Sequence, residues 1–100
     1  MKNSRYILSG HKAMPCDDLL KWAEWVETAD RVVAQETVGK VVVSTVFLGL
    51  DYSFGNGPPL FFETMVLGGP IDQETKLYTT WDEAVTGHQA MVELVKAKEA

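Results

Sequence analysis

The sequence has one cysteine, no long apolar run and no surplus of basic residues. The lone Cys16 cannot form an intrachain disulfide, and no apolar stretch of signal-peptide length follows positions 1–5. We therefore expect the protein in the reducing cytoplasm. The longest apolar stretch, residues 41–50, is about half as long as a membrane-spanning helix, so we expect no contact with a membrane.

Basic residues are outnumbered: nine Lys and Arg stand against fourteen Asp and Glu, which gives a net charge of -5. A negative chain repels the phosphate backbone, so we expect no nucleic-acid partner. An acidic domain can also imitate DNA toward a basic protein. Here the carboxylates are scattered among Lys and Arg, which favours a solvated surface and leaves mimicry as a minor alternative.

Motifs that carry a mechanism are missing as well. There is no phosphate-binding glycine loop, no dinucleotide fingerprint and no nucleophile elbow. A zinc site would require His11, Cys16 and His88 to converge with a carboxylate from distant segments. We expect no metal, no cofactor and no catalytic residue.

The length and composition indicate a single domain over residues 1–100. With 46% hydrophobic residues, the chain can bury a core of its own. Apolar runs broken by Gly, Pro and Asp predict the secondary structure. In chain order the expected elements are a strand at 5–8, a helix at 17–27, strands at 31–37, 41–50, 60–67 and 76–79, and a helix from 81 to about 98.

Both predicted helices have an apolar stripe and a start signal. Asp17 and Asp18 stand at the start of the first helix, and Thr80 and Glu83 have the spacing of a capping box at the start of the second. The first stripe consists of Leu19, Trp22, Ala23 and Val26, and the second of Trp81, Ala84, Val85, His88, Val92 and Val95.

Four consecutive strands favour an antiparallel meander, and two amphipathic helices favour packing on one of its faces. The predicted fold class is α+β, in the order β-α-β-β-β-β-α. The strand at 41–50 is apolar on both sides, which predicts a central strand covered on both faces. Two interpretations are open for the face without helices: a homodimer covers it, or a loop or the first strand does.

The loop at 51–59 is the best candidate for a binding site. It combines aromatic rings with backbone amides that glycine leaves accessible, and it has carboxylates on both sides. Such a loop can hold a small polar ligand with a flat ring, although a connection merely folded back by Gly and Pro has the same composition. The predicted ligand-binding residues are Tyr52, Phe54, Gly55, Asn56, Gly57, Glu63 and His88.

His88 enters this set because it lies on the apolar stripe of the last helix and is expected to face a sheet that carries Glu63. A buried His paired with a carboxylate can act as a general base. A core His that is satisfied by one hydrogen bond is the commoner arrangement. Since no nucleophile stands beside it in the sequence, we do not assign His88 a catalytic role.

Three segments carry a resemblance: 43–51 (VSTVFLGLD), 54–65 (FGNGPPLFFETM) and 80–88 (TWDEAVTGH). In these segments, and over most of the chain after the first helix, the sequence resembles a group of small uncharacterised proteins of tailed phages and prophages. The resemblance implies expression in the cytoplasm of an infected bacterium. It implies no catalytic residue.

Small accessory phage proteins often resemble inhibitors of host defence, and this analogy suggests three functions. Sequestration of a nucleotide-like signalling ligand suits the glycine-rich aromatic loop and a homodimer. Occlusion of a host defence protein suits the acidic surface and a spare apolar sheet face. A small enzyme acting on such a ligand would depend on His88 and Glu63. The expected partners are thus a small molecule or a host protein, and a second copy of the chain.

Overall fold

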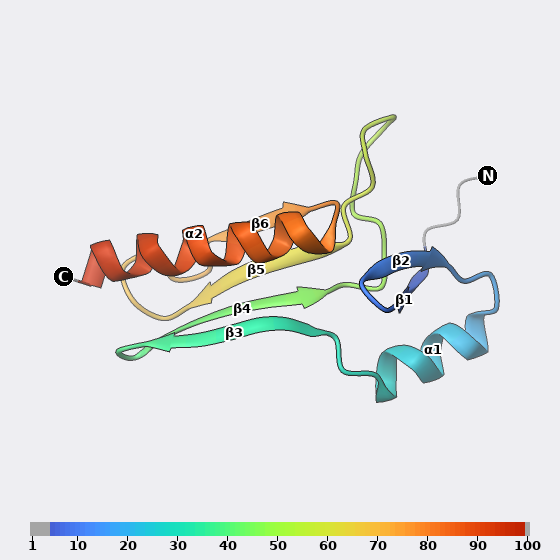
Figure 1. Cartoon of the computed structure of the whole chain (residues 1–100), viewed down its shortest axis with the longest axis horizontal. Coiled ribbons are helices and arrows are strands. Elements are labelled where there is room, and N and C mark those ends of the chain that lie inside the picture. Colours follow the sequence, from blue (N-terminus) through green and yellow to red (C-terminus); the bar gives the residue numbers. More distant parts are fainter. Residues whose placement is uncertain (1–4, 100) are drawn as a thin grey trace.

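A four-stranded antiparallel sheet forms the centre of the computed structural model, which describes residues 5–99. The strands are β3 (Val32–Val38), β4 (Val41–Phe47), β5 (Phe62–Leu67) and β6 (Thr75–Tyr78). Neighbours in the chain are neighbours in the sheet (Figure 1), because each connection leads directly back to the adjacent strand. The predicted α+β class and meander are confirmed.

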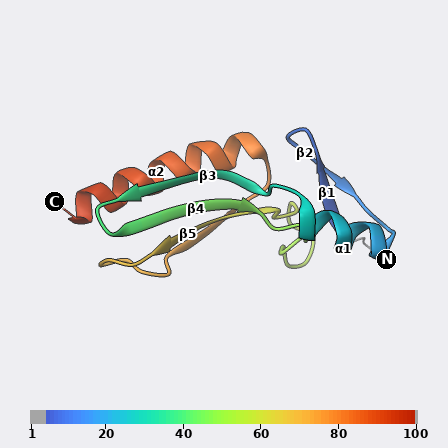
Figure 2. The same cartoon turned by 90° about the horizontal axis from the view of Figure 1, so that it is seen from below.

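Helix α2 (Trp81–Glu99) lies along one face of this sheet (Figures 1 and 2). Its start is the predicted capping box: the Glu83 amide donates to Thr80 Oγ1 at 3.1 Å, and the Thr80 amide donates to Glu83 Oε1 at 3.0 Å. Neither helix in residues 5–99 has the length and apolar character needed to cross a membrane.

The core lies between α2 and the sheet. Along β4, side chains alternate between fully buried and partly exposed, so only one face of the strand is covered. This corrects the expectation that β4 is covered on both faces. The buried residues are Val41, Val43, Thr45 and Phe47 of β4, Phe62, Thr64 and Val66 of β5, Phe61, and Ala84, His88, Met91, Val92 and Val95 of α2.

Helix α1 (Leu19–Thr28) does not join α2 on the sheet, contrary to expectation. It lies at the end of the sheet beside the N-terminal strands (Figure 1), where Trp22 Nε1 donates to the Gly49 carbonyl at 2.9 Å. Trp25 packs edge-on against Phe47, with ring centroids 5.7 Å apart. The Trp side of α1 therefore faces the protein. Leu19 of the predicted stripe is 56% exposed.

The N-terminal segment forms a hairpin where one strand was expected. Its strands are β1 (Tyr6–Ser9) and β2 (Lys12–Pro15), which pair antiparallel across a turn at Gly10 with φ +62°. The turn explains the extra strand, because glycine adopts positive φ without steric cost. The hairpin attaches to the end of the sheet, where the Tyr6 amide donates to the Gly49 carbonyl.

The sheet face opposite α2, which we call the open face, has no helix or strand of residues 5–99 packed over it (Figure 2). The hairpin and α1 lie beyond the end of the sheet, and the end of α1 borders this face only near Val32 and Val46. The strand register places Val32, Gln35, Thr37, Val42, Ser44, Val46, Glu63, Met65, Leu67, Thr75 and Leu77 on it.

Candidate functional site

The connection between β4 and β5 projects from the sheet as an arm, defined as residues 51–60 (Figure 1). Its neck is closed by hydrogen bonds. The Tyr52 amide donates to the Leu60 carbonyl at 3.0 Å, and Asp51 Oδ1 accepts from the amides of Ser53 and Leu60 at 2.8 and 3.0 Å. Asp51 thus holds both sides of the arm together, like the side chain of an Asx turn.

The tip of the arm is open to solvent. Phe54 is 95% exposed, Tyr52 is 45% exposed, and the three residues from Gly55 to Gly57 are exposed as well. Gly55 makes the turn with φ +64°. The structure therefore keeps the five predicted arm residues together, but it presents them on a projection and not around a hollow.

The other two predicted site residues, Glu63 and His88, do not meet. Glu63 lies on the open face, paired with Val46 and Leu77. His88 projects from α2 onto the opposite face, which also carries Thr64, the residue after Glu63. The expected pair of His88 with Glu63 is wrong, because successive residues of a strand point to opposite faces. The enzyme hypothesis loses its only support from the sequence.

His88 has other polar neighbours. Its Nδ1 lies 2.7 Å from Thr45 Oγ1, which lies 2.5 Å from Thr64 Oγ1, and all three residues are 0% exposed. The Nε2 atom makes no hydrogen bond within the described residues, and Glu36 Oε1 is 3.5 Å away. We call Thr64, Thr45 and His88 the buried polar array; Glu36, whose side chain is 42% exposed, lies at its end.

We assign the direction of these hydrogen bonds from Glu36, whose carboxylate can only accept. With the Nε2 proton directed at Glu36, Nδ1 accepts from Thr45 and Thr45 accepts from Thr64. A hydroxyl, an imidazole and a carboxylate also form hydrolase triads, but a triad needs a nucleophile that the substrate reaches. Thr45 is sealed under α2, so the buried polar array is structural.

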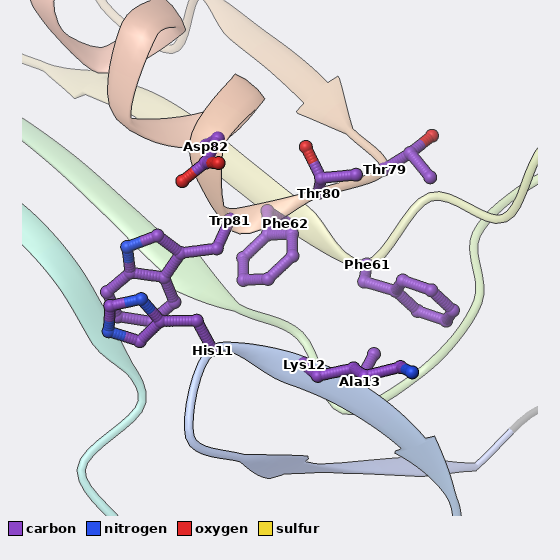
Figure 3. A pocket seen from close by; sticks show the side chains of 9 residues that line it. All are labelled: His11, Lys12, Ala13, Phe61, Phe62, Thr79, Thr80, Trp81 and Asp82. Carbon is purple, nitrogen blue, oxygen red and sulfur yellow. The ribbon is translucent and has the colours of Figure 1, made fainter.

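A hollow of about 420 Å³ lies between the N-terminal hairpin and the start of α2 (Figure 3). It is lined by residues 11–13 of the hairpin, by Phe61 and Phe62, and by residues 79–82. We call it the His11–Trp81 hollow, because these two rings stack in parallel, 3.8 Å apart with 3° between their planes. Its size lies in the range of small-molecule sites.

The walls of the His11–Trp81 hollow are aromatic, with a few polar groups. Phe62 meets Trp81 edge-on at 6.1 Å, while Lys12 and Asp82 bring one charge of each sign. This lining suits a flat ring with little net charge. Sequence reasoning missed the hollow, because His11 lies in a hairpin turn that the pattern did not predict and Trp81 fits the apolar stripe of a helix.

Among residues 5–99, no three His, Cys, Asp or Glu side chains gather closely enough to hold a metal ion. His11 stacks on Trp81, His88 is buried under α2, and Cys16 Sγ lies 3.6 Å from the Asp18 carbonyl at the start of α1. Comparison with protein-family models, with curated proteins and with solved structures found no match. The arm and the hollow are therefore interpreted from their own chemistry.

Proposed function

We propose that this chain is a non-enzymatic binding protein that attaches to another protein through its arm. Phe54 is the observation that carries the proposal, since this ring is 95% exposed at the tip of a projection whose neck is closed. A large apolar side chain held in water on a structured loop is typical of a residue that enters a pocket of a partner.

The energetics favour such a role. Burying a Phe side chain that was exposed stabilises a complex by roughly 1.5–3 kcal/mol. The neck of the arm loses little conformational entropy on binding, because Asp51 already clamps it and Pro58 and Pro59 restrict the backbone beside it. Preorganisation of the neck reduces the entropy that binding of the ring must offset.

The net charge of the chain favours a basic partner. Fourteen Asp and Glu outnumber nine Lys and Arg in the chain, which gives it a net charge of -5. A surface of one sign steers the protein toward a surface of the other sign and raises the association rate. Together with the resemblance to phage proteins, this supports an accessory protein that occludes a basic surface of a bacterial protein in the host cytoplasm.

Photo-crosslinking in infected bacteria tests the arm directly. The photo-reactive residue p-benzoylphenylalanine is placed at position 54 or, as a matched control, at position 20, where Leu20 of α1 is 80% exposed. We expect one host protein to crosslink at position 54 and not at position 20, and to be lost from capture by Phe54→Ala but not by Leu20→Ala. Equal crosslinking at both positions, or none at 54, refutes the proposal.

A second candidate function is sequestration of a small flat-ring ligand, which the His11–Trp81 hollow favours. A ligand that binds only the folded protein raises the midpoint of thermal unfolding. We expect this shift for a member of a panel of mononucleotides, cyclic oligonucleotides and NAD, and its loss in His11→Ala. If no member of the panel shifts the wild-type midpoint, this candidate is dropped and the arm proposal is unaffected.

A further inference from the structure

The edges of the sheet are built to resist the addition of another strand. Edge strand β3 has an irregularity in its register between Val32 and Ala34, and it turns the charged Glu36 toward the α2 side. The opposite edge strand, β6, has only four residues and carries Lys76. Bulges, inward charges and short edge strands are the features that oppose pairing between sheets. Association of this protein is thus disfavoured at both edges.

The open face has the opposite character. It carries apolar side chains from all four strands, and two of them, Val32 and Leu67, are 45% and 46% exposed. Glu63 is the only charged residue at the strand positions of this face, in a chain that has 23% charged residues. Glu27 and Arg31 border its end beside Val32 and Val46. Since most of the surface charge lies elsewhere, two copies with a net charge of -5 each repel one another least when they meet here.

The chemistry of the open face is also complementary to itself. In a two-fold dimer the same surface contacts itself, so each polar group must find a partner among the same kinds of group. The central row of the face runs through Gln35, Ser44, Met65 and Thr75. Amides and hydroxyls both donate and accept, and apolar groups pack on apolar groups. Glu63 lies in the end row nearest the arm, away from this centre.

We propose that two copies of the chain pack open face against open face, which forms a β-sandwich with one α2 on each outer side. A patch about six residues long and four strands wide covers roughly 400 Å². This is about half of the area that each partner of a standard interface buries. A dimer of this size dissociates on dilution. The arms remain outside it, so this inference does not rest on the binding role of Phe54.

Sedimentation at increasing protein concentration tests the dimer, with Met65→Lys as the disrupting variant and Leu94→Lys as the control. Met65 lies at the centre of the open face, whereas Leu94 is 42% exposed on α2. We expect wild type, Leu94→Lys and Phe54→Ala to form dimers from about 0.1 mM upward, as a small interface allows. Met65→Lys should remain monomeric at concentrations at least tenfold higher, while its circular dichroism is unchanged.

Two results overturn this inference. One is a wild-type protein that stays monomeric up to about 1 mM, the weak end of specific association, which would leave the open face to a different partner. The other is a Met65→Lys variant that dimerises like wild type. If Met65→Lys does not fold, Leu67→Glu at the half-exposed end of the face takes its place, with the same expected loss.

Discussion

Replacing Thr45 by Val removes one hydroxyl from the buried polar array and keeps the shape of the side chain. In the wild type this hydroxyl lies 2.7 Å from His88 Nδ1 and 2.5 Å from Thr64 Oγ1. The variant therefore leaves an imidazole nitrogen without a donor and a hydroxyl without an acceptor. Both stay in a core where His88 and Thr64 are 0% exposed, so water cannot replace the lost partner.

The expected loss of unfolding free energy follows from counting the polar groups left without a partner. A buried polar group left without a partner costs about 1–3 kcal/mol, whereas an ordinary hydrogen bond contributes about 1 kcal/mol net. We expect Thr45→Val to lower the free energy of unfolding by about 2–4 kcal/mol. Thr64→Val should cost only about 1 kcal/mol, because Thr45 can still donate to His88. The double variant has no hydroxyl at position 64 that needs an acceptor. The double variant should therefore lose less stability than the sum of the two single losses.

Urea unfolding of the three variants and the wild type measures these differences, provided that the slope of the transition is unchanged. Val32→Thr, on the open face, is a control for exchange between Val and Thr at a half-exposed site and should change stability by less than about 0.5 kcal/mol. Equal and additive costs for Thr45→Val and Thr64→Val would refute the direction assigned to the hydrogen bonds.

Three further predictions concern local features. A Cβ added by Gly87→Ala would overlap the ring end of Tyr78. The substitution should therefore lower stability in the wild-type background and raise it by up to about 1 kcal/mol in a Tyr78→Ala background. A change of the same sign in both backgrounds would contradict the contact. Asp51→Ala should speed proteolysis of the arm. Asp51→Asn should not, because its amide oxygen still accepts the two hydrogen bonds. Equal cleavage of both variants would show that the clamp is unimportant. Thr80→Ala should cost about 1 kcal/mol in urea unfolding and Thr80→Ser much less, unless the capping box contributes nothing.

The helix start and the strand order were predictable because they depend on residues close together in the chain. Thr80 and Glu83 are three residues apart, so their spacing alone identifies the capping box. The turn at residues 39–40 joins β3 and β4 through a tight connection, and antiparallel pairing of neighbours follows from it. Alternation along a strand also predicts two faces, but it does not tell which of them a helix will cover.

The sequence by itself therefore determined the fold class, the meander and the start of α2, since these follow from local patterns of a few residues. Only the tertiary structure decided which groups meet across long separations. It paired His88 with Thr45 and not with Glu63, brought His11 against Trp81, and left one sheet face open. The physical reason is that such contacts depend on the side of the sheet to which α2 packs and on the place where the N-terminal hairpin attaches, and no short stretch of the chain encodes either.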